Sequence, residues 1–377
     1  MIAVADTLLF RVHRSAIQPA LDAVFEAVDH KATIPILGNV LLRAAGGDLH
    51  LRGTDLGIEV ETSCELLDQG TLTALTVSGN DLREIVRNLP ESAEIAFTTG
   101  AFPDQVRILS GRSKFSLLTL PEKDFPSIAA QVTGEGFDLD IPPFIDALGK
   151  VTYAIREDKT RQYLSGACLH PESGDLIAVV GCDGHNLAVS RIGAGRTVDF
   201  PSTIVPLKTV KAIKKLFGER KGKAEFTITD AMIRIRCGGV TLISKLIEGT
   251  FPGYAQIIPP LSNHAAVAPV SSLKAAVSRV CLVANDLEKD TVRLQFERGS
   301  IRVSLKTSEG KDADEEVPID FDGEPIDIGF NGRYLTAMLS CIGTQDVAIH
   351  LSDATRPGLF RPTIEANEHF ILMPRKL

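Results

Sequence analysis

The sequence predicts an α+β fold made of three repeated domains, each with two helices and antiparallel sheets. Three observations predict it. Residues 205–254 have an earlier copy at residues 77–126 and a more diverged later copy at residues 328–374. Apolar residues at helical spacing recur with the same period of about 127 residues, and strand-like segments come in runs. A period this long indicates repeated domains and not a solenoid of short units, and runs of strands favour antiparallel sheets.

Each domain is expected to begin with an amphipathic helix. The first is predicted over residues 15–29, with Ser15 as its N-cap and Pro19 in the first turn, where amide protons lack partners. A second helix is expected half a domain later, most clearly at residues 207–217. The apolar positions that repeat in the first helix of each domain are Ile17, Leu21, Val24 and Val28, then Phe144, Leu148, Val151 and Ile155, then Leu273, Val277, Val280 and Ala284.

Alternation of apolar and polar residues predicts strands in most of the remainder. In the three domains the expected strands are 40–43, 48–53 and 57–62; 167–170, 176–180, 187–190, 225–229 and 232–236; and 292–296, 301–306 and 315–319. Gly46 and Gly47 predict a turn. The domain boundaries are expected at residues 134–137 and 263–268, because both stretches are turn-rich or weakly patterned. The expected domains are therefore residues 1–134, 135–263 and 264–377.

The composition is that of a globular protein with reduced cysteines. The chain has 377 residues, 44% of them hydrophobic and 23% charged, and a formal net charge of −8, so it is not a basic nucleic-acid binder overall. The six cysteines form no C-x-x-C pair, which indicates free thiols of a cytoplasmic protein. The N-terminus has no signal pattern and no apolar run approaches the ~20 residues that cross a bilayer. We expect no membrane contact.

Motifs for nucleotide, metal or hydrolase chemistry are absent from the sequence. The most reactive-looking cluster is Cys182-Asp-Gly-His185. Cys182 and His185 could bind a metal or form a nucleophile pair, but zinc requires four ligands and this cluster offers two. The simpler interpretation is a tight Asp-Gly turn between strands, because Asp55 stands at the same place one repeat earlier. No cofactor and no metal site are therefore predicted.

Basic residues gather on the predicted helices although the chain is acidic overall. Residues 208–223 contain seven lysines and arginines against one acid, Glu219. A solvated helix face is the simpler explanation, yet the other copies place Arg83, Arg87 and Arg333 on their equivalent helices. The first helices of the domains add Lys150, Lys274 and Arg279. Repeated basic helices suit a phosphate backbone contacted without regard to sequence. The first helix disagrees, because it carries Asp22, Glu26 and Asp29.

A set of short motifs, in order along nearly the whole chain, resembles the bacterial DNA polymerase III beta subunits, the sliding clamps. The motifs are Thr33-Ile-Pro-Ile-Leu-Gly-Asn39, Gly53-Thr-Asp-Leu56, Ser110-Gly-Arg-Ser-Lys-Phe-Ser-Leu117, Leu118-Thr-Leu-Pro121, Tyr163-Leu-Ser-Gly166, Asp183-Gly-His185, Ser244-Lys-Leu-Ile247, Phe251-Pro252, Gly329-Phe-Asn331 and Met373-Pro374. The resemblance implies DNA-clamp domains, with two inward-facing helices each, in a ring-shaped homodimer. It implies no catalytic activity, and a role in tethering DNA polymerases to DNA after loading by an ATP-driven clamp loader.

The resemblance also implies three groups of site residues. DNA would be faced by Lys31, Arg83, Arg87, Lys150, Arg161, Lys208, Lys211, Lys215 and Lys274. Peptides of the polymerase alpha subunit, the loader and other polymerases and repair proteins would bind a pocket of Leu164, Cys182, Gly184, His185, Leu187, Pro252, Ile257, Tyr334, Ile371, Leu372, Met373, Pro374 and Arg375, with Arg161 at its rim. The dimer interface would contain Arg107, Arg112, Lys114, Phe115, Leu282, Val283, Glu309 and Glu315.

Residue patterns bear on two of these groups independently. A basic strand within residues 105–120 and an acidic stretch within 301–319 could pair head to tail and cover each other's edge. The apolar chain end, residues 370–377, should be docked because free termini usually fray; a final strand completing the last sheet explains only part of it.

Two departures from the family pattern concern Asn186 and Lys376, where relatives usually have arginine. They predict an altered partner preference, as in a secondary clamp copy. Two other classes of function stay open from the sequence: a hydrolase or metal enzyme using Cys182 and His185, and a monomeric interaction scaffold without a DNA role.

Overall fold

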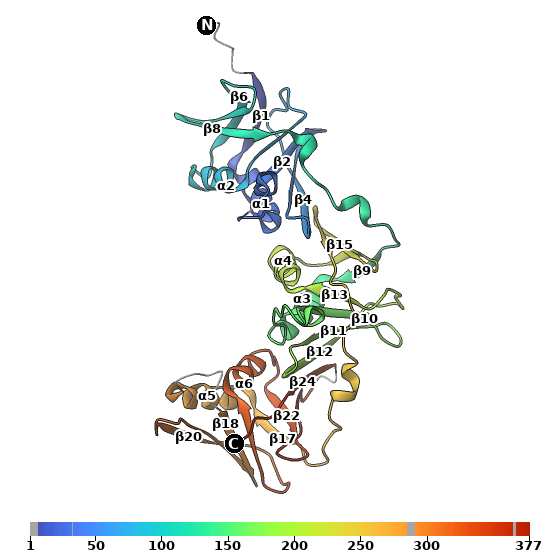
Figure 1. Cartoon of the computed structure of the whole chain (residues 1–377), viewed down its shortest axis with the longest axis vertical. Helices are drawn as coiled ribbons and strands as arrows, with labels where there is room; N and C mark the ends of the chain where they lie inside the picture. The colour runs from blue at the N-terminus through green and yellow to red at the C-terminus, as the bar shows by residue number, and fades with distance from the viewer. Residues whose placement is uncertain (1–6, 32, 285–290, 365–366) are drawn as a thin grey trace. The chain divides into compact units, whose positions relative to one another are not determined.

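The computed structural model describes residues 7–31, 33–284, 291–364 and 367–377. The chain divides into two compact units (Figure 1): one within residues 1–142 and 211–246, the other within 143–210 and 247–377. Strand pairing is antiparallel throughout the described residues, as predicted. In that same part of the chain, every helix is too short or too polar to cross a membrane.

The first unit is built on one twelve-stranded sheet. Its order is β1-β6-β7-β8-β5-β2-β3-β4-β16-β15-β14-β9. In that order the strands are Leu8–His13, Glu94–Thr99, Gln105–Ser110, Ser113–Leu120, Ala74–Ser78, Asn39–Ala45, Asp48–Thr54, Ile58–Glu65, Val240–Lys245, Met232–Cys237, Lys223–Ile228 and Phe137–Asp140. The sheet passes from one sequence repeat into the next where β4 pairs with β16, with Val60 opposite Leu242.

The second unit contains an eight-stranded and a four-stranded sheet. The larger has the order β13-β10-β11-β12-β24-β23-β22-β17 and the smaller β20-β19-β18-β21. The larger comprises Thr203–Pro206, Gly166–Pro171, Leu176–Cys182, Asn186–Gly193, Glu368–Leu372, Gly358–Pro362, Asp346–His350 and Ala266–Pro269, and the smaller Asp312–Pro318, Ser300–Lys306, Thr291–Glu297 and Ile326–Asn331. Here too a sheet joins two repeats, because β12 pairs with β24.

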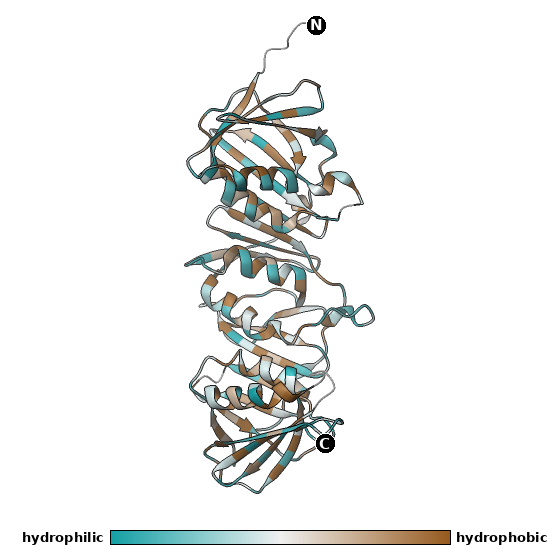
Figure 2. Ribbon diagram, turned by 90° about the vertical axis from the view of Figure 1, so that its left-hand side faces the viewer, coloured by the Kyte–Doolittle hydropathy of each residue, from teal (hydrophilic) through white to brown (hydrophobic). Residues whose placement is uncertain are grey.

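Six α-helices occur in the described residues, two for each sequence repeat, as predicted. They are α1 Arg14–Val24, α2 Gly79–Asn88, α3 Ile141–Thr152, α4 Leu207–Phe217, α5 Val270–Val280 and α6 Gly332–Leu339. Figure 1 shows α1 beside α2 and α5 beside α6. Hydrophobic and hydrophilic residues alternate along many of the strands (Figure 2), which is the pattern that predicted them.

The first helix differs from the prediction at both ends. It begins at Arg14 after His13, which makes no side-chain cap, so Ser15 is not the N-cap, and Pro19 lies inside the helix. It ends at Val24 in a short 3-10 turn, after which Val28 is extended yet buried. Ile155 likewise lies beyond the end of α3 and is buried. The apolar spacing in the first helices therefore indicated buried positions, except at half-buried Ala284, but it did not show where α1 ends. The helix predicted over residues 207–217, in contrast, matches α4 at both ends.

Two glycines show how closely the helices pack on the sheets. A Cβ on Gly53 of β3 would overlap the carbonyl oxygen of Val24 at the end of α1. One period later, a Cβ on Gly181 of β11 would overlap the carbonyl oxygen of Val151 in α3 and lie 3.1 Å from Cγ1 of Ile155. Both strands need glycine because backbone of the helix end meets backbone of the strand.

We expect Gly181→Ala to destabilise the protein by about 1–3 kcal/mol, the usual range for overpacking a well-packed core. A backbone carbonyl cannot move aside as a flexible side chain can. The matched control is Gly343→Ala, since a Cβ there meets no atom within 4 Å. Urea unfolding followed by circular dichroism measures both variants. Equal midpoints for Gly181→Ala and wild type would show that the helix shifts without cost.

Candidate functional site

The Cys182–His185 segment is a tight turn that joins β11 to β12. Gly184 has a φ of 90°, a conformation that glycine adopts without strain. One carboxylate oxygen of Asp183 accepts hydrogen bonds from the amides of His185 at 2.8 Å and Asn186 at 2.7 Å. Asp55 accepts the equivalent pair from Gly57 and Ile58, at 2.9 and 2.7 Å. The predicted Asp-Gly turn is therefore confirmed as a repeated structural feature.

This turn forms one wall of a small apolar hollow of about 40 Å³. The other walls come from the 3-10 turn Tyr254–Ile257 and from the end of β24. The lining residues are Cys182, Gly184, His185, Asn186, Leu187, Ile257, Ile371 and Met373. Four larger and shallower hollows of about 510 to 590 Å³ lie elsewhere among the described residues. The small hollow is the candidate site because most of its lining residues belong to the peptide pocket predicted from the sequence.

The last residues of the chain are docked against this wall. The amide of Met373 donates to the carbonyl of His185 at 2.9 Å, which extends the β12–β24 ladder beyond Leu372. The amide of Arg375 then donates to the carbonyl of Gly329 in β21 at 2.7 Å. These two bonds hold the chain end at two points, as its apolar sequence predicted.

The other residues of the predicted pocket lie around the hollow to different degrees. Leu164 belongs to the buried cluster that also contains Cys182, Leu187 and Ile371. The Tyr334 ring lies 6.2 Å from the His185 ring. Pro252 lines a separate hollow with His170 and Tyr254 and does not line the small one. Leu372 is buried in β24, whereas Pro374 and Arg375 are half-buried in the docked end.

Asn186 is a lining residue that the predicted pocket omitted. Its side chain is 2% exposed, and its Nδ2 donates to Asp183 at 3.0 Å, while its Oδ1 has no hydrogen-bond partner. The position between His185 and Leu187, both predicted to line the pocket, was the signal in the sequence that could have included it.

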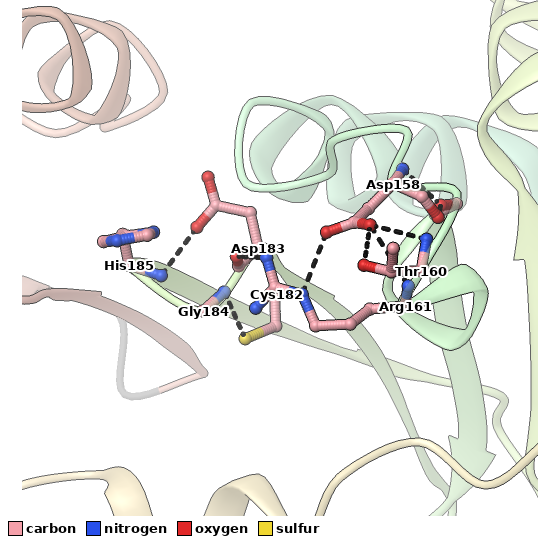
Figure 3. A network of polar contacts seen from close by, with 8 residues as sticks. Asp158, Thr160, Arg161, Cys182, Asp183, Gly184 and His185 are labelled. Atoms are coloured by element: carbon pink, nitrogen blue, oxygen red, sulfur yellow. Dashed lines mark hydrogen bonds and ion pairs between the residues drawn. The ribbon is translucent and has the colours of Figure 1, made fainter. Parts of the chain in front are cut away.

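Arg161 lies against the Cys182–His185 turn (Figure 3), on the side of the hollow that we call its mouth. Its Nη2 lies 3.5 Å from the carbonyl of Asp183, and a Cβ on Gly184 would lie 2.8 Å from its Nη1. Its Nε donates to Asp158 at 2.9 Å. Hydrogen bonds from Thr160 and Arg161 hold the pKa of the Asp158 carboxyl well below its usual range, so this carboxylate stays charged at neutral pH.

The geometry of Cys182 and His185 does not form a nucleophile pair. The Cys182 Sγ accepts a long bond from the Gly184 amide at 3.4 Å, and burial raises the pKa of the thiol, which disfavours a reactive thiolate. No group of three His, Cys, Asp or Glu side chains that could hold a metal ion occurs in the part of the chain that the structure describes. The arrangement thus favours a binding surface over an enzyme site.

The predicted DNA-facing residues differ in whether an acidic residue of the chain pairs with them. Lys208, Lys211 and Lys215 are exposed on α4. Lys215 pairs with Glu26, and Arg83 pairs with Asp22 at 2.6 Å. Two of the three acidic residues that disagreed with a DNA role, Asp22 and Glu26, are therefore partners of predicted DNA-facing cations.

The remaining members of that group lie on several elements. Lys150 is 15% exposed and pairs with Glu368 and Asp146, so we leave it out of the proposal below. Lys31 and Arg87 are exposed, and Lys274 on α5 is half-exposed.

Several strands expose an edge among the described residues, and β8 and β20 are two of them. Only Thr119 and Leu120 of β8 pair with β5, so residues 113–118 pair on one side alone, with β7. β20 lies at the end of the four-stranded sheet and pairs only with β19.

The residues predicted for the dimer interface lie on or near these edges. Lys114 and half-buried Phe115 belong to β8, Arg112 to the preceding turn and Arg107 to β7. Glu315 of β20 accepts from Arg279 at 2.7 Å, and Glu309 is exposed before that strand. Leu282 is 82% exposed beside Val283. A basic and an acidic edge, each with an apolar neighbour, are thus both present.

Repeated α+β domains, open sheet edges and a small apolar hollow are the features of a binding protein. Comparison with known families identifies it further. The N-terminal, central and C-terminal domain models of the DNA polymerase III beta subunit match residues 8–129, 139–253 and 255–376. The chain therefore belongs to the DNA polymerase III beta subunit family. It is a sliding clamp of DNA replication and not an enzyme.

The relatives are similar over their full length. Proteins named Beta sliding clamp from Caulobacter vibrioides and Pseudomonas aeruginosa are 32% and 30% identical, over 97% and 98% of this chain and 99% and 100% of theirs. The crystal structure of a Pseudomonas aeruginosa DnaN sliding clamp bound to griselimycin has a TM-score of 0.93 at 30% identity, covering 98% of this chain and 100% of that one. A Caulobacter crescentus clamp structure has the same score at 31% identity, covering 99% of each chain. The comparisons give no support to a secondary clamp class.

Proposed function

We propose that two copies of this chain form a ring that encircles duplex DNA without regard to sequence and tethers DNA polymerase III to it. The observation that carries the proposal is the match of all three clamp domains and of the whole fold to sliding clamps. The proposed domains are those expected from the sequence, residues 1–134, 135–263 and 264–377. Because the chain is related to bacterial sliding clamps, we place it in the cytoplasm.

The proposed dimer joins the β8 edge of one protomer to the β20 edge of its partner. An open edge presents unpaired backbone groups and invites strand addition. Lys114 with its neighbours makes one edge basic, whereas Asp312, Asp314 and Glu316 make the other acidic. Phe115 would bury its ring against Leu282 and Val283 of the partner subunit. Because the contact is heterologous, it closes into a ring or polymerises.

Light scattering at micromolar concentration should give twice the chain mass of 40.6 kDa. Phe115→Asp should shift the protein toward monomer, because it places a charge in the apolar part of the interface. Phe102→Asp is the matched control, since Phe102 is 64% exposed but lies outside β8. A wild-type protein that stays monomeric as its concentration rises would contradict the ring.

The proposed DNA contact is electrostatic and weak. Exposed lysines such as Lys208 and Lys211 attract phosphates across water, and salt screens that attraction. Some neighbouring cations are already paired with Asp22 and Glu26. Lasting association must therefore come from encirclement and not from affinity.

Clamp loaded onto nicked circular DNA should remain bound, and linearising the DNA should release it, because the ring can then slide off the ends. Gel filtration of the DNA before and after cleavage measures retention.

The double variant Lys211→Glu with Lys274→Glu should load less efficiently. Lys123→Glu makes the same kind of charge change outside the α-helices, in the 3-10 turn Glu122–Asp124, and should load normally. Equal retention on circular and linear DNA would exclude the topological mechanism.

The small hollow is the proposed binding site for short peptides of the polymerase alpha subunit, the clamp loader and other polymerases and repair proteins. Apolar side chains buried there would each contribute roughly 1.5–3 kcal/mol. Two such anchors reach micromolar affinity, about −8 kcal/mol, only with help from backbone contacts. Exposed His185 and half-buried Met373 place apolar surface and backbone groups within reach of such a ligand.

Deleting residues 373–377 should weaken binding of a polymerase tail peptide at least ~10-fold, or 1.4 kcal/mol. The deletion removes the Met373 wall and the bond between Met373 and His185. Deleting only residues 376–377, which do not line the hollow, is the matched control. Titration calorimetry gives both affinities, and light scattering checks that the dimer persists. Unchanged affinity without all five residues would remove this hollow from the proposal.

A further inference from the structure

The two carboxylate oxygens of Asp158 make different contacts. Oδ1 accepts hydrogen bonds from the Thr160 amide at 2.8 Å, the Thr160 hydroxyl at 2.6 Å and the Arg161 amide at 3.1 Å. Oδ2 accepts from Nε of Arg161 at 2.9 Å. Oδ1 thus shapes the loop, whereas Oδ2 holds the guanidinium, and Figure 3 shows both sets of contacts converging on this one side chain.

The guanidinium that Asp158 holds lies over the turn that walls the hollow. Its Nε–H is used by Asp158 and its Nη2 makes a long contact of 3.5 Å with the Asp183 carbonyl. A guanidinium has five N–H donors in a fixed plane, so most of the Nη donors stay available to a ligand. Gly184 permits this approach, because a Cβ there would collide with Nη1.

Arg161 brings a positive charge to this mouth. The described residues that line the hollow include no lysine or arginine. Asn186, which does line the hollow, is neutral and bonded to Asp183. The Arg161 side chain is 44% exposed, so a bound peptide can reach it.

We propose that Asp158 is a positioning residue of the peptide site: its Oδ2 holds the Arg161 guanidinium beside Gly184, where it receives a carboxylate side chain of a partner peptide next to the apolar anchors. The inference rests on the proposed peptide-binding function. It assigns the site a preference for acidic over neutral peptides of the same shape, and it gives Asp158 a part in that preference without contact to the ligand.

A charge-only explanation predicts the opposite effect of removing the Asp158 carboxylate. Asp158 is negative, so its replacement by Asn makes the mouth more positive and should strengthen binding of an acidic peptide if only net charge matters. The positioning role predicts weaker binding. Asn keeps an oxygen that can accept from the Thr160 and Arg161 amides, but it turns an NH2 group toward Nε of Arg161. An NH2 group cannot accept a hydrogen bond, so the guanidinium is no longer held. The sign of the change separates the two explanations.

The experiment measures calorimetric affinities of the full-length protein for amidated peptides that carry two leucines and one aspartate. The aspartate is placed in turn before, between and after the leucines, and each peptide has an asparagine counterpart. Wild type should bind at least one aspartate peptide about two- to fivefold tighter than its counterpart, as expected for an exposed ion pair. Asp158→Asn and Arg161→Gln should both bring that ratio close to one, and added salt should reduce it in wild type alone.

Asp353→Asn is the matched control. Asp353 accepts from Thr355 and Arg356 with the same three distances, 2.8, 2.6 and 3.1 Å, and its Oδ2 lies 3.3 Å from Nε of Arg356, but it does not line the hollow. It should leave the peptide ratio unchanged. Tighter or unchanged binding of the aspartate peptide by Asp158→Asn would overturn the positioning role, as would equal binding of both peptides by wild type. Failure of wild type to bind any peptide would instead overturn the proposed peptide site itself.

Discussion

Antiparallel pairing of β12 with β24 is the interaction on which the candidate peptide site depends. It sets Leu187 opposite Ile371, and one further bond joins Met373 to His185. Because side chains alternate between the faces of a strand, Ile371 and Met373 share a face and both line the hollow. A slip of one residue would turn both away from it. The register of a single strand pair therefore decides whether the hollow has an apolar wall.

That pairing also explains which part of the architecture the sequence could predict. The repeated apolar phases predicted the helices, the strands and the threefold repetition, because side-chain periodicity reports burial. They did not predict that β4 pairs with β16 or β12 with β24, so that the twelve-stranded and the eight-stranded sheet each pass from one repeat into another. Backbone groups at a strand edge make these bonds, and any sequence supplies such groups. The start of α1 was missed for a related reason, since this helix has no side-chain cap for the sequence to show.

The candidate site was predictable where a residue type carries the geometry. Gly184 needs its positive φ and the Asp-Gly pair predicts a turn, whereas the apolar chain end predicts docking. Asp158 had no such signal, because its role depends on the distance from Arg161 to Gly184 across the fold. The same spacing of Asp, Thr and Arg recurs at Asp353, where the same contacts line no part of the hollow. Local pattern and function are therefore separable here, and the tertiary position decides between them.

Tertiary position also decides which charged residues can act on DNA. A formal net charge of −8 is unexpected for a protein that we propose to surround a polyanion. Several acidic residues, however, are committed to pairs inside the chain, including Asp22 with Arg83 and Glu368 with Lys150. Such pairs join α1 to α2 and α3 to β24, and they reduce the number of cations that can release counterions from DNA. Because the salt-dependent affinity for DNA rises with that number, a clamp built this way gains little from direct attraction. A weak contact allows sliding, and the closed ring that we propose would then supply the retention that the charges do not.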